Sequence, residues 1–388
     1  IALSWPPLST ALPYTVASGA PVRTYTSDVE MIGRRYGETP PAAAARFYRV
    51  RASLDAGRAT PARIHVDQFG YRPRSRKVAV LSDPREGFNA DRAYRPGGTL
   101  TVRRAPGGEP VFSASPTAWR AGAVHSNSGD RAWWFDFSNV TNTGHYFIHD
   151  TSNDLASVVF RIADNVYDEV LTQALRTFYY QRCGCAKETP YAEEAWADPL
   201  PCHADDAACL SVTNPLPATM QDLRGGWHDA GDCNKYVNFA DKSVHDLLFA
   251  YEHNPGAWRD HNHLPESGNG LPDLLDEVRY ELDWLLAMQQ PDGSVLHKVC
   301  ATNWGYGSPP SSDPVGRRYA PPSASATISA CGVFAHAADV FFGVGNLDSR
   351  SYAQTLSNAA VTAWQWLDRH PARIPSTYDN AGFAPNAA

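Results

Sequence analysis

The decapeptide Gly-Gly-Trp-His-Asp-Ala-Gly-Asp-Cys-Asn occupies residues 225–234 and runs into Lys235 and Tyr236. Asp, Gly and Asn disfavour a regular element, so the stretch predicts a tight loop ahead of a helix. Such a loop can aim the carboxylates of Asp229 and Asp232 at one point, as the activation of a water molecule requires. A bare pair of aspartates at this spacing is most often a solvated turn. Here the ten-residue context, with an aromatic residue and a histidine just ahead, favours a catalytic turn.

From Val166 onward, apolar residues recur with the period of α-helices. Pro272 occupies a first-turn position and predicts the start of a long helix that ends before the Pro-Asp-Gly of residues 291–293. Two further helices are predicted over about residues 324–342 and 351–369. Two others have apolar faces formed by Leu171, Leu175 and Phe178 and by Val244, Leu247, Leu248 and Tyr251. Long loops join these roughly five helices, and long loops on a helical scaffold usually carry function.

The segment ahead of the helices has a different pattern. Residues 1–61 are rich in Pro, Ala, Ser and Thr and predict an irregular leader. Over residues 62–163, short apolar or alternating runs are separated by Pro, Gly, Asn or Asp, which predicts an antiparallel β-sandwich. The expected fold class is therefore multidomain, with this sandwich followed by an all-α domain over residues 164–388.

Composition excludes two classes of partner. The 388 residues carry a net charge of −7 with no basic block, so the sequence predicts no binding of nucleic acid. No apolar run approaches the roughly 18 residues of a membrane-spanning helix, so no membrane partner is expected either. The chain starts at Ile1 without a basic and apolar leader, and we expect any signal peptide to have been removed or never included.

Five motifs, in this order, make the chain resemble glycoside hydrolase family 9, in the subgroup with an immunoglobulin-like domain ahead of the catalytic domain. The resemblance covers about residues 62–370. The motifs are His-Val-Asp-Gln-Phe-Gly-Tyr at 65–71, Phe-Tyr-Tyr-Gln-Arg-Cys at 178–183, Gly-Gly-Trp-His-Asp-Ala-Gly-Asp at 225–232, Glu-Ser-Gly-Asn-Gly-Leu-Pro-Asp-Leu-Leu-Asp-Glu at 266–277 and His-Lys-Val at 297–299.

The resemblance implies an (α/α)6 barrel, hydrolysis of β-1,4-glucans such as cellulose with inversion, and bound calcium. It assigns Asp232 as the general base that takes a proton from the attacking water, and Asp229 as the residue that holds this water. It also places His297 in the sugar cleft, where Trp304 and Tyr236 are weaker candidates for substrate contacts.

The subgroup often binds zinc, and Cys183, Cys202, His203 and His228 match its ligands residue by residue. Two thiolates and two imidazoles form a closed tetrahedral structural site, which would brace the catalytic turn through His228. The alternatives are a disulfide between Cys183 and Cys202, with histidines at the surface, or free thiols.

The sequence contains seven cysteines, so at least one is left over when the others are paired. We expect a disulfide between Cys185 and Cys209 and a second between Cys300 and Cys331, which leaves Cys233 unpaired.

Calcium ligands are harder to assign. Asp273, Asp276 and Glu277 are oxygen donors beside a Gly-rich loop, as a hard cation requires. Acidic residues in the first turn of a helix are more often explained by the helix dipole.

The chain departs from the family pattern in one respect. Inversion needs two carboxyl groups on opposite faces of the sugar. The family's general acid is a Glu that follows a Pro-His-His-Arg-like segment near the end of the catalytic domain, and neither occurs here. Roughly five helices also cannot close an (α/α)6 barrel, so an apolar surface would face water. We therefore expect a fragment whose partner is the C-terminal remainder of the same protein; the alternatives are a degenerate homologue and a separate partner chain that supplies the remainder. Residues 1–388 expressed alone should be insoluble or show negligible glucanase activity.

Two functions compete at this point. The first is a secreted β-1,4-glucanase of endoglucanase type, which acts on a β-glucan polysaccharide or oligosaccharide. The alternative is a non-catalytic glycan-binding homologue that keeps the aromatic cleft.

Overall fold

The computed structural model describes residues 62–87, 90, 93–301 and 307–371, together with the backbone of five short strands between residues 2 and 52. The chain divides into two units, Ile1–Val170 and Leu171–Ala388. Trp304, a candidate for sugar stacking, lies outside the described residues.

The leader contains strands, which differs from the irregular structure expected for residues 1–61. Strand β2 pairs with both β3 and β5 in an antiparallel sheet, and β1 pairs with β4. The sequence did not predict these strands, because β-branched or aromatic residues alternate with other residues only over runs of five at most. The strands are β1 (Ala2–Ser4), β2 (Tyr14–Ser18), β3 (Arg23–Ser27), β4 (Arg35–Gly37) and β5 (Tyr48–Ala52).

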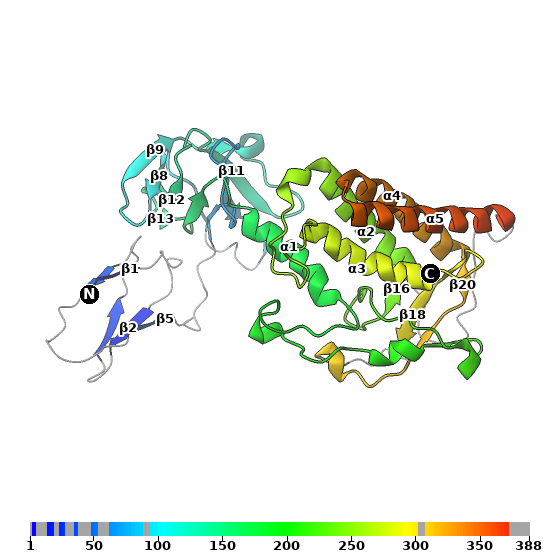
Figure 1. The fold of residues 1–388 in the computed structure, drawn as a ribbon. Helices are drawn as coiled ribbons and strands as arrows, with labels where there is room; N and C mark the ends of the chain where they lie inside the picture. Colours follow the sequence, from blue (N-terminus) through cyan, green and yellow to red (C-terminus); the bar gives the residue numbers. More distant parts are fainter. Residues whose placement is uncertain are drawn as a thin grey trace. The chain divides into compact units, whose positions relative to one another are not determined.

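The rest of the first unit is a β-sandwich, as the sequence predicts (Figure 1). One sheet has the order β10-β11-β7-β6; the other has the order β13-β12-β8-β9, with β14 also paired to β12. Alternate residues of the strands point inward, and Leu81, Val102, Phe135 and Ile148 are fully buried between the sheets. The strands are β6 (Ile64–His65), β7 (Val78–Pro84), β8 (Leu100–Arg104), β9 (Pro110–Ala114), β10 (Thr117–Ala118), β11 (Asp130–Asp136), β12 (Gly144–Asp150), β13 (Leu155–Ala156) and β14 (Phe160–Ile162).

The second unit is built on helices close to those predicted. Helix α3 begins directly after Pro272, and Asn346 caps α5 by accepting a hydrogen bond from the main-chain N–H of Ser349. Gly345, with φ of +87°, ends α4 and lets the chain turn into α5. The helices are α1 (Asp168–Gln181), α2 (Val237–His253), α3 (Asp273–Met288), α4 (Ala324–Val344) and α5 (Leu347–Arg369).

Helix α4 is long and apolar enough to span a membrane by length and composition, with a mean hydropathy of 1.5 over an 18-residue window. The expectation from uninterrupted apolar runs missed it, because a window tolerates polar residues such as His336 and Asp339. Its buried face includes Val333, Phe334 and Phe341, which belong to the core of the second unit. Packing of this kind is typical of a central helix in a globular domain.

Short strands connect the loops that hold the unusual residues. Four of them form a sheet in the order β15-β19-β18-β16, in which Lys235 of β16 is the partner of Val299 of β18. Strand β16 therefore anchors the C-terminal end of the 225–234 segment. The described residues contain five α-helices, and a closed barrel stays a prediction. The strands are β15 (Leu210–Ser211), β16 (Lys235–Tyr236), β17 (Val295–Leu296), β18 (Lys298–Ala301), β19 (Arg317–Tyr319) and β20 (Pro322–Ser323).

Candidate functional site

The 225–234 segment is a loop that ends at β16 and α2, as the sequence predicts. The main-chain N–H of Asp229 donates to the carbonyl of Asn234 at 2.8 Å, and that of Cys233 donates to the carbonyl of Ala230 at 3.0 Å. At the start of the loop, Gly226 has φ of +74°, and a Cβ there would lie 2.7 Å from ring atoms of Trp284. A glycine is therefore required at this position by both backbone conformation and space.

The two aspartates of the loop differ in their surroundings. Asp232 is half-buried and accepts from Asn234 through both oxygens, from the main-chain N–H at 3.2 Å and from Nδ2 at 2.8 Å. Asn234 is itself fixed, because its Oδ1 accepts from the main-chain N–H of Ala301 at 2.8 Å. Asp229 is exposed as a residue, yet loss of hydration at its carboxyl and the negative charge of Asp232 raise its pKa. The two carboxyl groups are thus close enough to interact, as a shared water requires.

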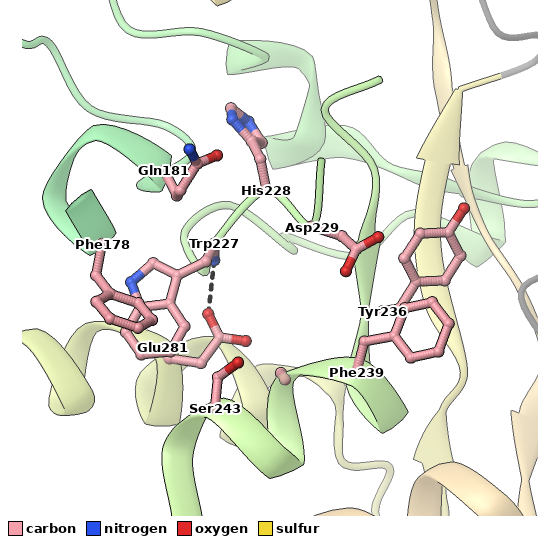
Figure 2. A pocket seen from close by; sticks show the side chains of 10 residues that line it. Phe178, Gln181, Trp227, His228, Asp229, Tyr236, Phe239, Ser243 and Glu281 are labelled. Atoms are coloured by element: carbon pink, nitrogen blue, oxygen red, sulfur yellow. Dashed lines mark hydrogen bonds between the residues drawn. The ribbon is translucent and has the colours of Figure 1, made fainter. Parts of the chain in front are cut away.

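A cavity of about 140 Å³ opens beside Asp229 (Figure 2). Aromatic rings form much of its wall, and the polar groups come from α1, α2, α3 and the 225–234 loop. Tyr236 and Phe239 pack at 5.3 Å between ring centroids on one side of it. Its lining residues are Phe178, Gln181, Trp227, His228, Asp229, Tyr236, Phe239, Ala240, Ser243 and Glu281.

Of the two described residues assigned to the sugar cleft, one lines this cavity. Tyr236 does so, while its hydroxyl accepts a hydrogen bond from Asn234 Nδ2 at 3.2 Å. His297 lies between β17 and β18, is only 1% exposed, and has its Nδ1 bonded to Ser323 Oγ at 2.7 Å. The structure therefore buries His297 instead of presenting it at the cavity.

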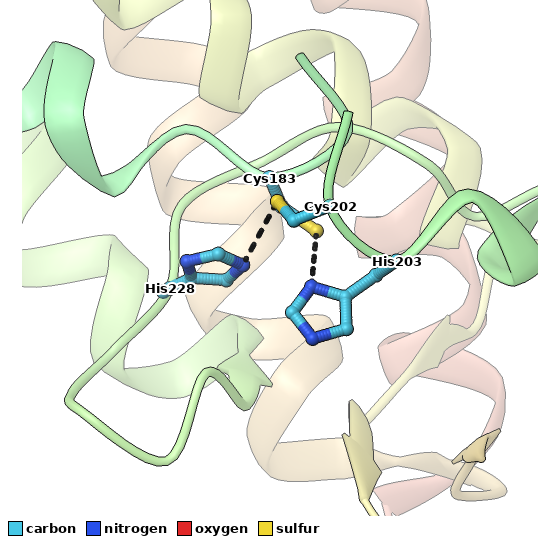
Figure 3. Close-up of side chains that lie close together, drawn as sticks. All are labelled: Cys183, Cys202, His203 and His228. Carbon is cyan, nitrogen blue, oxygen red and sulfur yellow. Dashed lines mark hydrogen bonds between the residues drawn. The ribbon is translucent and has the colours of Figure 1, made fainter. Parts of the chain in front are cut away.

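The four predicted zinc ligands converge, although they come from three separate segments (Figure 3). Their ligand atoms all lie within 4.8 Å of one another, and all four residues are buried. Cys183 Sγ lies 3.7 Å from His203 Nδ1, and Cys202 Sγ lies 3.8 Å from His228 Nε2. Tetrahedral Zn–S and Zn–N bonds of ordinary length give a sulfur–nitrogen separation of roughly 3.6 Å. The residues present fit zinc.

A ring of charged side chains surrounds this cluster. Asp313 Oδ2 lies 3.4 Å from His203 Nε2, the nitrogen that points away from the cysteines. Asp206, fully buried, pairs with Lys235 at 2.9 Å and with Arg317 at 3.2 Å. With its Nε2 proton donated to the Asp313 carboxylate, His203 would keep Nδ1, the nitrogen that faces Cys183, unprotonated for a metal ion.

All seven cysteines are unpaired, which corrects the expected disulfides Cys185–Cys209 and Cys300–Cys331. Cys209 instead packs in the core of the second unit, and the Cys331 thiol donates to the carbonyl of Ala360 at 3.5 Å. The disulfide reading of Cys183 and Cys202 is also contradicted. A hydrogen bond from Cys183 lowers the pKa of the Cys202 thiol to about 6, which favours the thiolate that a metal binds.

A second cluster joins three carboxyl groups near the start of α3. The ligand atoms of Asp260, Asp273 and Asp276 lie within 4.8 Å of one another. Asp273 Oδ1 and Asp276 Oδ2 are buried without a hydrogen-bond partner. Burial raises the pKa of Asp276 to about 7, with Asp273 and Asp260 adding repulsion. The sequence missed Asp260, because it lies in the loop ahead of the motif that drew attention.

Glu277, the third residue proposed for calcium from sequence, lies in a different network. Its carboxylate accepts from Arg182 Nε at 3.1 Å and from Trp227 Nε1 at 2.8 Å. Arg182 also binds Glu266 at 2.9 Å, so both sides of its guanidinium are paired. One helical turn further, Glu281 accepts from the main-chain N–H of Trp227 at 2.6 Å. Sequence reasoning missed Glu281, although a charged residue on the apolar face of a helix was a usable signal.

Two protein-family models match this chain. A model of Glycosyl hydrolase family 9 matches residues 167–386, and a model of the Cellulase N-terminal ig-like domain matches residues 59–153. Endoglucanase D of Acetivibrio thermocellus is 36% identical over 319 residues, which cover 80% of this chain and 46% of that protein. The chain therefore spans about half the length of this curated relative.

Solved structures of family 9 endoglucanases are also similar to this chain. A metagenome-derived glycoside hydrolase family 9 endoglucanase is 32% identical with a TM-score of 0.68, covering 83% of this chain and 57% of its own. A Zn-binding triple mutant of the family 9 endoglucanase J30 is 31% identical with a TM-score of 0.66, covering 81% and 56%. Because the family model matches more than half of the residues of this chain, the chain belongs to glycosyl hydrolase family 9.

Proposed function

We propose that this chain carries the general base of an inverting β-1,4-glucan hydrolase of endoglucanase type. The observation that carries the proposal is the 225–234 loop, which holds Asp232 close to Asp229, and Asp229 lines a cavity with aromatic walls. Endoglucanase D, the relative described above, supports the glucan as substrate by its name.

In this proposal Asp232 accepts the proton of the water that attacks the anomeric carbon. Its two hydrogen bonds from Asn234 stabilise the carboxylate and fix its orientation, so that the remaining lone pairs are available to water. Asp229 binds the same water and orients it. The general acid, which protonates the leaving oxygen, is a Glu supplied from outside these 388 residues, in the C-terminal remainder of the same protein.

The sugar would contact the aromatic wall of the cavity. Tyr236 and Phe239 offer faces for a pyranose ring, and Trp304 remains a proposed stacking residue. Because the imidazole of His297 is buried, we propose that His297 acts on the sugar indirectly, through strand β18, which begins at the adjacent Lys298.

We assign a structural zinc ion to Cys183, Cys202, His203 and His228. The charges around the site support a cation. Two thiolates and the carboxylates of Asp206 and Asp313 carry four negative charges, against three positive charges on Lys187, Lys235 and Arg317. The J30 variant with 31% identity is described as Zn-binding. When bound, zinc would fix His228 and thereby hold the adjacent Asp229 in place.

Calcium is proposed for Asp260, Asp273 and Asp276. Three neighbouring carboxyl groups, of which Asp273 and Asp276 each have a buried oxygen without a hydrogen-bond partner, provide the all-oxygen environment that calcium prefers, and a cation would relieve their mutual repulsion. Glu277 is not part of the proposed set, since Arg182 already neutralises it. We further propose that the protein acts outside the cell, where polymeric glucan is found.

The experiment that tests this function is Asp232→Asn in the complete gene product, assayed on a soluble β-glucan. Turnover should fall by several orders of magnitude while glucan affinity, measured by affinity electrophoresis, stays within about twofold. Asp348→Asn, the same change at an exposed position of α5, serves as the control and should leave turnover unchanged. Turnover by neither wild type nor variant, with glucan binding retained, would support the alternative of a non-catalytic glycan-binding homologue.

A further inference from the structure

Glu281 is a carboxylic acid in an apolar setting. It lies on α3 among Val278, Leu282 and Leu285, and it is fully buried. One oxygen, Oε2, accepts from the main-chain N–H of Trp227 at 2.6 Å, while Oε1 has no hydrogen-bond partner. Figure 2 shows this free oxygen turned toward the space that Ser243 and Asp229 also border.

Trp227 is held by α3 at two points. Glu277 accepts its indole N–H at 2.8 Å, and Glu281 accepts its main-chain N–H. The main-chain contact is the one that matters for the loop, because Trp227 is only two residues ahead of Asp229. A shift of the main chain at this point would move the catalytic turn directly.

Glu277 and Glu281, the two acids of α3 that accept hydrogen bonds from Trp227, differ in charge balance. Glu277 forms an ion pair with Arg182 at 3.0 Å. Glu281 forms no ion pair with any residue that the structure describes. Lys235 attracts its carboxylate, but Lys235 already pairs with Asp206 at 2.9 Å, and the charges of Glu277 and Cys183 disfavour ionisation of Glu281. Burial raises the pKa of Glu281 to about 8, in agreement with a carboxyl group that is uncharged at neutral pH.

An uncharged carboxyl has both an acceptor and a donor. The carbonyl oxygen takes the Trp227 N–H, and the hydroxyl is left without a partner at the wall of a cavity with room for a few water molecules. A buried donor of this kind is retained only if something in the cavity accepts from it. A water molecule or a sugar hydroxyl beside Asp229 fits that requirement.

We propose that Glu281 is a positioning residue for the reaction: in its neutral form it fixes the main chain of the catalytic turn through Trp227 and donates a hydrogen bond into the cavity that Asp229 shares. The inference rests on the proposed hydrolytic function. It explains why a helix that is otherwise apolar at this position carries an acid.

The test compares Glu281→Gln with Glu281→Met in the complete gene product. Gln keeps an acceptor for Trp227 and a donor for the cavity, so kcat should stay within about threefold of wild type. Met keeps the volume and removes both, so kcat should fall about 100-fold with KM nearly unchanged, as expected for a displaced catalytic group. Glu188→Met, the same change at an exposed position, is the control.

Three further measurements separate the possible failures. Zinc content should remain at one per chain in both variants. Should Glu281→Met fail to fold, the pH profile of kcat for Glu281→Gln decides. If Glu281 is neutral in the wild type, the acidic limb of the profile should coincide with that of the wild type. A displacement of this limb by about 0.5 pH units or more overturns the inference, because it reveals that the substitution removed a negative charge. Full activity of Glu281→Met also overturns it. If Asp232→Asn is equally active, the proposed function fails instead.

Discussion

Replacing Gly226 by alanine should destabilise the second unit by about 2–5 kcal/mol. Two separate costs contribute. The backbone at Gly226 has φ of +74°, which costs a residue with a Cβ about 1–2 kcal/mol. The new Cβ would also lie 2.7 Å from Cγ and Cδ2 of Trp284, and overpacking of a buried site costs about 1–3 kcal/mol. Trp284 is 1% exposed and has little freedom to move.

Two neighbouring glycines in the same loop separate these costs. Gly225 has φ of +89°, but the nearest atom to its Cβ position is Trp284 Cβ at 3.9 Å, so Gly225→Ala should cost only about 1–2 kcal/mol. Gly231 has neither constraint, since nothing lies within 4 Å of its Cβ position. Gly231→Ala should therefore change the free energy of unfolding by less than about 0.5 kcal/mol.

The assay is denaturant unfolding of the zinc-bound protein, followed by tryptophan fluorescence, with the midpoint and slope fitted together. The predicted order of destabilisation is Gly226→Ala, then Gly225→Ala, then Gly231→Ala. Equal stability of Gly226→Ala and Gly231→Ala would refute the packing of the loop on Trp284.

Three more predictions concern the candidate zinc and calcium sites. Asp313→Ala should weaken zinc binding about 10- to 100-fold, measured by chelator competition, because the Nε2 proton of His203 loses its acceptor; unchanged affinity would exclude that role. In calcium-free buffer, the protonated Asp276 carboxyl contributes its full stabilisation of the folded protein below about pH 4. Because burial raises the pKa of Asp276 to about 7, this contribution to the free energy of unfolding is lost as pH rises from 4 to 7. Asp276→Asn should remove this loss, at most about 4 kcal/mol, from the stability profile between pH 4 and 7, and a profile parallel to wild type would contradict it. Calcium should raise the unfolding temperature of wild type but not of Asp273→Asn, and an equal rise in both would place the cation elsewhere.

Local signals predicted the scaffold well. The apolar period predicted all five helices, and the ends predicted for α3, α4 and α5 lie within about four residues of those observed. These predictions succeed because the apolar face of a helix is formed by one continuous segment of sequence. The glycines and aspartates of the 225–234 loop likewise predict a turn directly. The four candidate zinc ligands came from the resemblance to the family, and the structure brings them together.

Contacts between distant segments were harder to predict. The cysteine pairs were wrong because spacing in sequence says nothing about where Cys209 and Cys331 point. The acidic cluster was partly misassigned, since Glu277 faces Arg182 while Asp260 comes from a preceding loop. Glu281 was overlooked because a single acid in an apolar period reads as an exception, and only the fold reveals its contact with Trp227.

The stereochemistry of the first product tests the central claim most directly. Proton NMR of a β-1,4-glucan oligosaccharide, recorded in the first minutes of hydrolysis by the complete gene product, distinguishes the anomers before mutarotation mixes them. A base at Asp232 that activates water for direct displacement predicts the α-anomer as the initial product. The β-anomer as the initial product would show retention through a covalent intermediate and would contradict the assignment of Asp232 as general base.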